Sequence, residues 1–202
     1  GAAFPFIIDA ELAAKANRFS RSSGATLFMT LLSAWFCLLG QRSGQADLIV
    51  GSPIANRHPS LLEPLIGFFV NTLALRADLS GQPTFNQLLA RTRQTCLDAY
   101  AHQDIPFESL IDTLKVPRRL DHAPLFQVMF VLENTTPQPS LAWPELQVRL
   151  NESENTVAKF DLTLSLKETS TGIQARLEYA TDLFDQETIA QLAQDFVDLL
   201  AS

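Results

Sequence analysis

The fold is decided by the stretch Lys159–Thr181, KFDLTLSLKETSTGIQARLEYAT. In its first half apolar residues alternate with polar ones, and a period of two is typical of a strand that is buried on one face only. The second half alternates in the same way. Ser170, Thr171 and Gly172 lie between the two halves and suit a tight turn. We therefore predict a β-hairpin that rests one face on a hydrophobic core.

Four longer segments show the spacing of apolar residues that predicts amphipathic or buried helices. Each follows a residue whose side chain suits a helix N-cap: Asp9, Thr26, Thr84 and Asp185. The segment after Thr26, LFMTLLSAWFCLL, is apolar nearly all round, so we expect a deeply buried helix. We expect residues 40–44, which begin and end with glycine, to terminate it. A further short helix is expected to end near Leu114.

Three apolar runs predict further strands: DLIVGSP from Asp47, GFFVNTLALR from Gly67 and PLFQVMFVLEN from Pro124. Strands scattered between helices indicate a mixed α and β fold. We therefore expect an α/β protein, in the form of an α+β sandwich with a mixed sheet and flanking helices.

Composition narrows the class of protein. The 202 residues are 47% hydrophobic and 18% charged, so much of the surface is expected to be apolar or covered by a partner. The formal net charge of -7 repels a phosphate backbone, and nucleic acid is not an expected ligand. We expect neither a membrane span nor a secretion signal, and the opening GAAFPFII is expected to lie inside a larger domain. Cys37 and Cys96 fall in apolar helical patterns, which suits reduced core thiols and a cytoplasmic location.

General motifs of enzyme chemistry are missing from the sequence. The eight glycines form neither a GxGxxG fingerprint nor a phosphate loop, and there is no GxSxG elbow. The histidines, His58, His102 and His122, lie far apart, so no metal site is expected. A Ser/His/Asp triad assembled in space stays open, since triads do not follow sequence order.

One stretch, AHQDIPFESL, places an imidazole and two carboxylates around a proline and a phenylalanine: His102, Asp104, Glu108, Pro106 and Phe107. Each has a structural role at a joint between helices. The histidine suits the last turn of one helix, and Asp104 could cap the next. The proline suits a first helical turn, where an acidic residue is also favoured. We favour architecture over acid/base catalysis for this stretch.

The same stretch carries a resemblance to a known family. HQDIPFE resembles a signature of the condensation domains of nonribosomal peptide synthetases. Residues 66–76, IGFFVNTLALR, and 118–127, RRLDHAPLFQ, resemble two more, and residues 50–57, VGSPIANR, resemble a loop near the acyl-transfer centre. KFDLTLSL and LEYATDLFD are also similar to segments of that family. The segments follow the family's order and spacing over nearly the whole chain.

The resemblance implies a particular half of a domain. Condensation domains have two lobes, each with a chloramphenicol acetyltransferase-like fold, and the catalytic HHxxxDG motif lies in the first lobe. No two histidines are adjacent in this sequence. Residues 1–202 therefore resemble the C-terminal lobe alone, and we expect this fragment to be inert by itself. The implied partners are the N-terminal lobe, upstream donor and downstream acceptor carrier proteins, and an adjacent adenylation domain.

The implied activity is that of an acyltransferase. The complete domain would form an amide bond between a donor acyl or peptidyl thioester and an acceptor aminoacyl thioester, both carried on phosphopantetheine arms, with no tightly bound cofactor. FVNTLALR followed by HQDIPFE is more similar to peptide-bond-forming members than to epimerisation or heterocyclisation domains. A non-catalytic module that recruits partner proteins is the alternative.

The resemblance also implies that this lobe forms one wall of a reaction tunnel, and four residues are candidates for that wall. Ser52 is expected to orient the amine or the intermediate, or else it only turns the chain ahead of Pro53. Gly51 would let the backbone approach the pantetheine arm, or it is a plain loop glycine. Asn71 and Thr72 interrupt an apolar strand, so their polar groups need partners. We expect a structural role for both at the contact between lobes, with tunnel lining as the second choice.

The segment 133–159 contains several prolines and lacks a regular pattern. Loops of this length usually have a task. The resemblance implies a loop that crosses to the missing N-terminal lobe, with Trp143 as an anchor, and an ordinary surface excursion is the alternative. Asn56 and Arg57, at the end of VGSPIANR, are expected to fix their loop by hydrogen bonds, and binding of carboxyl or phosphate groups is the alternative.

Overall fold

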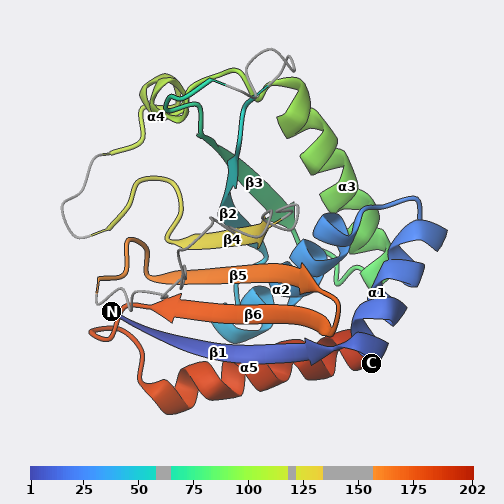
Figure 1. Ribbon diagram of the computed structural model, residues 1–202. Helices are drawn as coiled ribbons and strands as arrows, with labels where there is room; N and C mark the ends of the chain where they lie inside the picture. Colours follow the sequence, from blue (N-terminus) through green and yellow to red (C-terminus); the bar gives the residue numbers. More distant parts are fainter. Residues whose placement is uncertain (58–64, 118–121, 134–156) are drawn as a thin grey trace, which may run out of the picture.

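A six-stranded mixed β-sheet with helices on one face forms the described part of the chain, residues 1–57, 65–117, 122–133 and 157–202 of a computed structural model (Figure 1). The predicted α/β fold with a mixed sheet is confirmed. The strands are β1 (Ala2–Asp9), β2 (Asp47–Ile54), β3 (Asn71–Asp78), β4 (Val128–Glu133), β5 (Leu162–Thr169) and β6 (Gly172–Tyr179). The helices are α1 (Ala10–Ser22), α2 (Leu27–Ser43), α3 (Phe85–Ala101), α4 (Phe107–Leu114) and α5 (Gln186–Ala201).

The predicted hairpin lies inside the sheet, whose strand order is β1-β6-β5-β4-β2-β3. β5 and β6 are antiparallel, with Leu164 opposite Leu177 and Thr169 opposite Gly172. β1 adds to β6 antiparallel, and β3 adds to β2 antiparallel. β4 runs parallel to both β5 and β2. The amino-terminal strand and β3 therefore form the two edges, and the three parallel strands occupy the middle.

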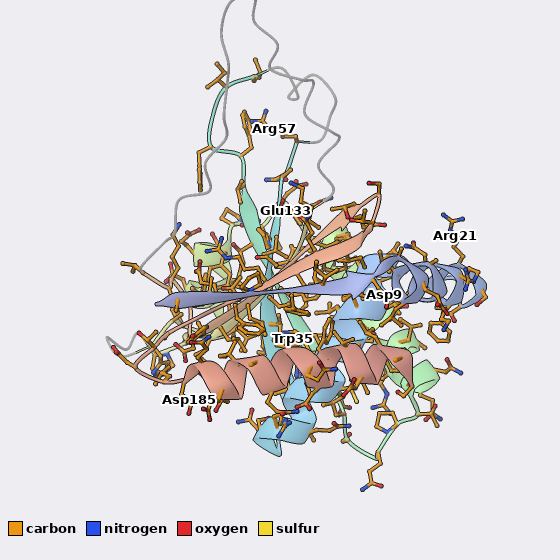
Figure 2. The ribbon with its side chains drawn as sticks, turned by 60° about the horizontal axis from the view of Figure 1, so that its bottom comes forward. Asp9, Arg21, Trp35, Arg57, Glu133 and Asp185 are labelled. Atoms are coloured by element: carbon orange, nitrogen blue, oxygen red, sulfur yellow. The ribbon has the colours of Figure 1, made fainter. Side chains whose placement is uncertain are left out.

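Alternation along the strands separates a buried face from an open one. The buried face packs against α2 and α5, and Trp35 of α2 meets Phe196 of α5 edge to face, with ring centroids 5.7 Å apart. Figure 2 shows Trp35 between the sheet and α5, and Glu133 on the opposite side of the sheet. The opposite face carries exposed or half-buried side chains such as Ile7, Lys167 and Arg176. The helices α1, α2, α3 and α5 thus cover one face of the sheet. The short helix α4 lies at the other face, where Phe107 packs against Phe126, and much of that face is bare.

All four predicted N-caps are confirmed by hydrogen bonds from backbone N–H groups to the capping side chains. The acceptor residues are Asp9, Thr26, Thr84 and Asp185, and Thr84 forms a full capping box with Gln87. The deep burial of α2 is also confirmed. The break expected over residues 40–44 falls at its far end, because the helix continues to Ser43 and stops at Gly44 in the left-handed conformation, with φ 70°.

Two predicted strands are shorter than their apolar runs. β3 begins at Asn71, and the preceding Ile66 and Phe68 are exposed, Phe68 by 93%. β4 begins at Val128, since the residues before it turn: Leu125 has φ 72°, and the Phe126 N–H donates to the Pro124 carbonyl at 2.9 Å. Each apolar run therefore contains a strand, but hydrophobicity alone does not show where in the run the strand begins.

β1 was not predicted as a strand. It pairs with β6 along its whole length, although Pro5 interrupts its sequence pattern. Proline is tolerated on an edge strand, because the N–H that it lacks can belong to the unpaired side.

Both cysteines are free thiols. Cys96 is fully buried and Cys37 is half-buried. Burial raises the pKa of both, that of Cys96 to about 12, so neither is a ready thiolate. Among the described residues no single helix has the length and hydropathy to cross a membrane; α1 and α2 reach that threshold only as a pair, bent by 105°.

A row of three aromatic rings lies on the sheet face opposite the main core, and its middle ring, that of Phe126, covers Gly51. Phe126 lies 5.3 Å from Phe107 and 5.7 Å from Phe160, centroid to centroid, and we call these three residues the aromatic column. A Cβ atom at Gly51 would lie 2.2 Å from a ring carbon of Phe126 and 2.5 Å from the sulfur of Met129. The close approach that requires glycine here is therefore to side chains of this same chain.

A buried hydrogen bond between α1 and α2 yields a first prediction. The hydroxyls of Ser20 and Thr30 lie 2.7 Å apart, and Ser20 is 1% exposed. We expect Ser20→Ala to lower the free energy of unfolding by about 1 kcal/mol, as measured by urea denaturation. Ser22→Ala, on the exposed side of the same helix, is the control and should change it by less than about 0.5 kcal/mol. Equal losses of unfolding free energy in the two variants would show that the Ser20–Thr30 hydrogen bond does not stabilise the fold.

The packing around Gly51 yields a second prediction. We expect Gly51→Ala to destabilise the protein by about 1–3 kcal/mol, because the added methyl group overlaps Phe126 and Met129. In a double variant with Phe126→Leu the combined loss should be smaller than the sum of the single losses, since the smaller side chain makes room. An unchanged melting temperature for Gly51→Ala would show that the column moves aside at no cost.

Candidate functional site

The carboxyl ends of β2, β4 and β5 lie at one edge of the sheet, because these strands are parallel. In open α/β sheets, ligands bind outside the carboxyl ends of the strands. The loop after β2, which carries Arg57, projects from this edge (Figure 2). The search for a site therefore starts there.

A cavity of about 380 Å³ opens at this edge, on the helix-covered face of the sheet. Its walls come from the ends of β2, β4 and β5, the first turn of α2 and the last turn of α3. Three hydroxyl-bearing residues line it, Thr26, Ser52 and Tyr100, and Glu168 adds a carboxylate. The remaining lining is largely apolar. Such a combination of apolar walls and a few polar groups is typical of a small-molecule site.

Ser52 is the buried polar residue of this cavity. It is 3% exposed and pairs across the strands with Leu73. Within the described part of the chain its hydroxyl makes no hydrogen bond, although it borders the cavity. A hydroxyl that borders a cavity and has no protein partner can bond to whatever enters the cavity.

Tyr100 enters the same cavity from the end of α3. Burial, with a smaller contribution from Cys96, raises the pKa of its phenol to about 12. The phenol therefore stays protonated at neutral pH and can donate a hydrogen bond. The first turn of α2 also lines the cavity, and its end of the helix dipole is positive. The phenol and this end of the helix favour negative charge on a ligand oxygen, and the Glu168 carboxylate in the same lining opposes it.

Asn71 lies outside the cavity, at the start of β3, and its carboxamide makes four hydrogen bonds. Its Nδ2 donates to the carbonyls of Gln103 and Ile105, both at 2.8 Å. Its Oδ1 accepts from the N–H groups of Thr72 at 2.9 Å and Phe107 at 3.2 Å. The expectation that Asn71 needs partners is met by the stretch that follows α3. One side chain thus joins two segments that the sequence presented as separate motifs.

The structure does not gather the four predicted wall residues at one place. Ser52 lines the cavity, whereas Gly51 lies beneath Phe126 on the opposite face. Thr72 is half-buried next to Asn71, and neither residue lines the cavity. Strand alternation explains the separation of Gly51 from Ser52, since consecutive residues point to opposite faces.

The residues of HQDIPFE form a joint between α3 and α4. His102 is the C-cap of α3, and its Nδ1 lies 2.8 Å from the Asp98 carbonyl. Asp104 does not cap α4 as expected. The N-cap residue is Pro106, which has no side-chain acceptor, and Asn71 accepts the Phe107 N–H instead. Glu108 lies exposed in the first turn of α4, in agreement with the expected charge preference.

The imidazole and the two carboxylates of this stretch are all exposed, and no hydrogen bond or ion pair links them within the described residues. Nor does any group of three His, Cys, Asp or Glu side chains there come close enough to hold a metal ion. The chemically useful polar groups are instead those of the cavity.

Sequence reasoning missed Tyr100 and the first turn of α2 as site elements. The sequence predicted only a capping role for Thr26 and no role for Tyr100. Tyr100 and the first turn of α2 line one cavity only because β2 and β4 pair in parallel in the folded chain. The predicted crossing loop, with Trp143, lies outside the described residues except at its two ends.

Arg57 fixes its loop, as expected. Its Nη1 donates to the Leu65 carbonyl at 2.7 Å, and its guanidinium lies 4.5 Å from the ring centroid of Phe69. These contacts hold the segment before β3 in place beside the carboxyl edge.

Comparisons with known proteins agree with this geometry. The family model described as Condensation domain matches residues 2–202. One of the linear gramicidin synthase proteins of Brevibacillus parabrevis is 50% identical over 206 residues, which cover 100% of this chain and 3% of that protein. Malpinin synthetase of Mortierella alpina is 51% identical over 181 residues, 90% of this chain and 2% of that protein. The chain thus spans only a few per cent of the length of these curated relatives.

Solved structures share the fold. The X-domain from teicoplanin biosynthesis, solved in complex with OxyB, is 30% identical with a TM-score of 0.87, over 98% of this chain and 44% of that chain. A four-domain nonribosomal peptide synthetase bound to AMP and glycine matches 100% of this chain and 16% of its own, with a TM-score of 0.87 at 22% identity, which bears on the fold alone. Taken with the family match over residues 2–202, these similarities show that the chain belongs to the condensation-domain family of nonribosomal peptide synthetases.

Proposed function

We propose that residues 1–202 are the C-terminal half of a condensation domain. In the complete domain the amine of an acceptor aminoacyl thioester attacks the carbonyl of a donor acyl or peptidyl thioester. A C–N bond forms, the C–S bond of the donor breaks, the donor thiol leaves, and the amine gives up a proton. The observation that carries this proposal is the match of 98% of the chain to only 44% of a condensation-fold domain, in a sequence without adjacent histidines.

An apolar segment beside the carboxyl edge supports the missing half. Leu65, Ile66, Phe68 and Val70 are all exposed, and Arg57 contacts the same segment at the Leu65 carbonyl and the Phe69 ring. Contiguous exposed apolar residues mark a surface that another protein part covers. The N-terminal lobe is the part that we propose for this surface.

Reaction chemistry sets two demands on the site. The two thioesters must be aligned, and ideal alignment can supply roughly 7–11 kcal/mol of the barrier. The tetrahedral oxyanion must be stabilised, and one well-placed hydrogen-bond donor can be worth about 3–4 kcal/mol. The catalytic base is expected from the HHxxxDG motif of the other lobe, so this chain would supply a wall and donors.

The cavity at the carboxyl edge can meet the second demand in part. Ser52 is a buried residue whose hydroxyl is unbonded within the described chain, and this hydroxyl would donate to the intermediate or accept from the amine. Tyr100 lines the same cavity and would add a neutral donor, since a phenol is protonated at neutral pH. The positive end of α2 would favour negative charge nearby.

The proposed partners follow from the same reading. Upstream donor and downstream acceptor carrier proteins would bring the substrates on phosphopantetheine arms, and an adenylation domain would lie next to the condensation domain. The synthetases similar to this chain support such an assembly.

We propose a cytoplasmic location, which suits the two free thiols. We also propose that residues 133–159 cross towards the N-terminal lobe, since β4 ends with Glu133 at the carboxyl edge.

A second candidate is a non-catalytic module that recruits partner proteins. One observation favours it: the X-domain from teicoplanin biosynthesis, at 30% identity, was solved in complex with OxyB. The two candidates differ in the sequence upstream of this chain. An intact HHxxxDG motif there favours catalysis, and its loss favours recruitment.

Ser52 provides the direct test of the catalytic proposal. In the complete domain we expect Ser52→Ala to lower the single-turnover rate of amide formation about tenfold, which corresponds to one lost hydrogen bond of about 1.4 kcal/mol. The melting temperature should stay unchanged. Product would be quantified by mass spectrometry after release from the acceptor carrier.

The matched control is Ser165→Ala, a serine on β5 that faces the open side of the sheet. It should leave both the rate and the melting temperature unchanged. A normal rate for Ser52→Ala would remove Ser52 from the mechanism.

The half-domain proposal has a test of its own. We expect the isolated 202-residue chain to fold cooperatively yet give no dipeptide with loaded donor and acceptor carriers, because it holds no catalytic histidine pair. Adding a separately expressed N-terminal half should restore some product. Robust synthesis by the fragment alone would overturn the proposal.

A further inference from the structure

We infer that Asn71 is a positioning residue that sets the place of the Ser52 hydroxyl from outside the cavity. The inference rests on the role proposed above for Ser52. It is carried by two chains of contacts that start at the Asn71 carboxamide and end at the segment Gly51–Ile54.

The first chain of contacts is the aromatic column. The Asn71 Oδ1 accepts the Phe107 N–H at 3.2 Å and so fixes the start of α4. The Phe107 ring lies 5.3 Å from Phe126, which fills the space above Gly51. Gly51 directly precedes Ser52. A shift of α4 would therefore be passed to β2 through packed rings.

The second chain of contacts is the β2–β3 ladder. Asn71 lies opposite Ile54, and Leu73 lies opposite Ser52. The Nδ2 bonds to the carbonyls of Gln103 and Ile105 tie the first residue of β3 to the end of α3. The carboxamide thus holds the last paired residues of β2 and β3, beside Ser52, as well as the aromatic column above Gly51.

Ser52 needs such support because its hydroxyl has no hydrogen bond within the described chain. Its place depends only on the backbone of β2 and on the packing around it. Functional groups must be held to within roughly 0.5 Å of the productive geometry, and this precision comes from the residues behind them. Asn71 does not line the cavity and would act through Ser52 alone.

The test is a double-mutant cycle in the complete condensation domain. Asn71→Asp keeps the size and both acceptor bonds but removes the two donors. We expect it to lower the single-turnover rate about threefold to tenfold, with little change in KM for the acceptor. With Ser52→Ala already present, Asn71→Asp should lower the rate no further. A purely structural role would lower the rate by the same factor in both backgrounds.

Two further variants make the cycle decisive. Asp185→Ala removes the cap of α5, remote from the cavity, and serves as the control for lost stability. It should lower the melting temperature without changing the rate below that temperature. Phe126→Leu loosens the column without touching Asn71, and it should also lose its effect on the rate when Ser52 is alanine. It replaces Asn71→Asp if that variant does not fold.

The outcomes separate this inference from the proposed function. A normal rate for Ser52→Ala overturns the role of Ser52, and the inference with it. A lowered rate for Ser52→Ala, combined with independent effects of Asn71→Asp, overturns only the inference. Loss of the Asn71→Asp effect in the Ser52→Ala background supports both.

Discussion

The carboxamide of Asn71 satisfies backbone groups that no helix or strand can reach. The carbonyls of Gln103 and Ile105 and the N–H of Phe107 lie in or next to the short connection between α3 and α4, where regular hydrogen bonding stops. Left unpaired, each such group would carry a desolvation cost if buried. Asn71 is also the first residue of β3. Its hydrogen bonds therefore fix the position of the joint between α3 and α4 relative to the edge of the sheet. The aromatic column and the Gly51 end of β2 depend on that relation.

The features that could be predicted from the sequence are those whose physical cause is local. The hairpin of β5 and β6 follows from alternation and a turn, and the N-caps follow from one side chain and the next helical turn. β1 could not be found in this way, because its strand conformation depends on pairing with β6 at the far end of the chain. The run before β3 misled for another reason. Its apolar residues indicate burial, but nothing within the described chain buries them.

The candidate site was predictable in part. Ser52 was singled out on a resemblance, and it does line a cavity, while the joint role of HQDIPFE was read from helix-end preferences. The partners of these residues were not predictable. Tyr100 lies at the cavity because β4 pairs in parallel with β2, which brings the end of α3 beside the ends of these strands. Asn71 accepts the hydrogen bond expected of Asp104 because β3 begins beside α4. Both facts belong to tertiary structure and leave no mark in local sequence.

The pairing of β1 with β6 has a consequence for how the protein is made. Ala2 lies opposite Tyr179, so a strand that leaves the ribosome before the rest of this sheet must wait for the strand that emerges last. Until then β1 offers an unpaired edge, and Pro5 limits its ability to pair with another chain. Synthesis of the core helix α2 and the parallel strands can proceed meanwhile, but the sheet is complete only when β6 arrives. The sheet of residues 1–202 therefore cannot finish folding before the β5–β6 hairpin has been translated.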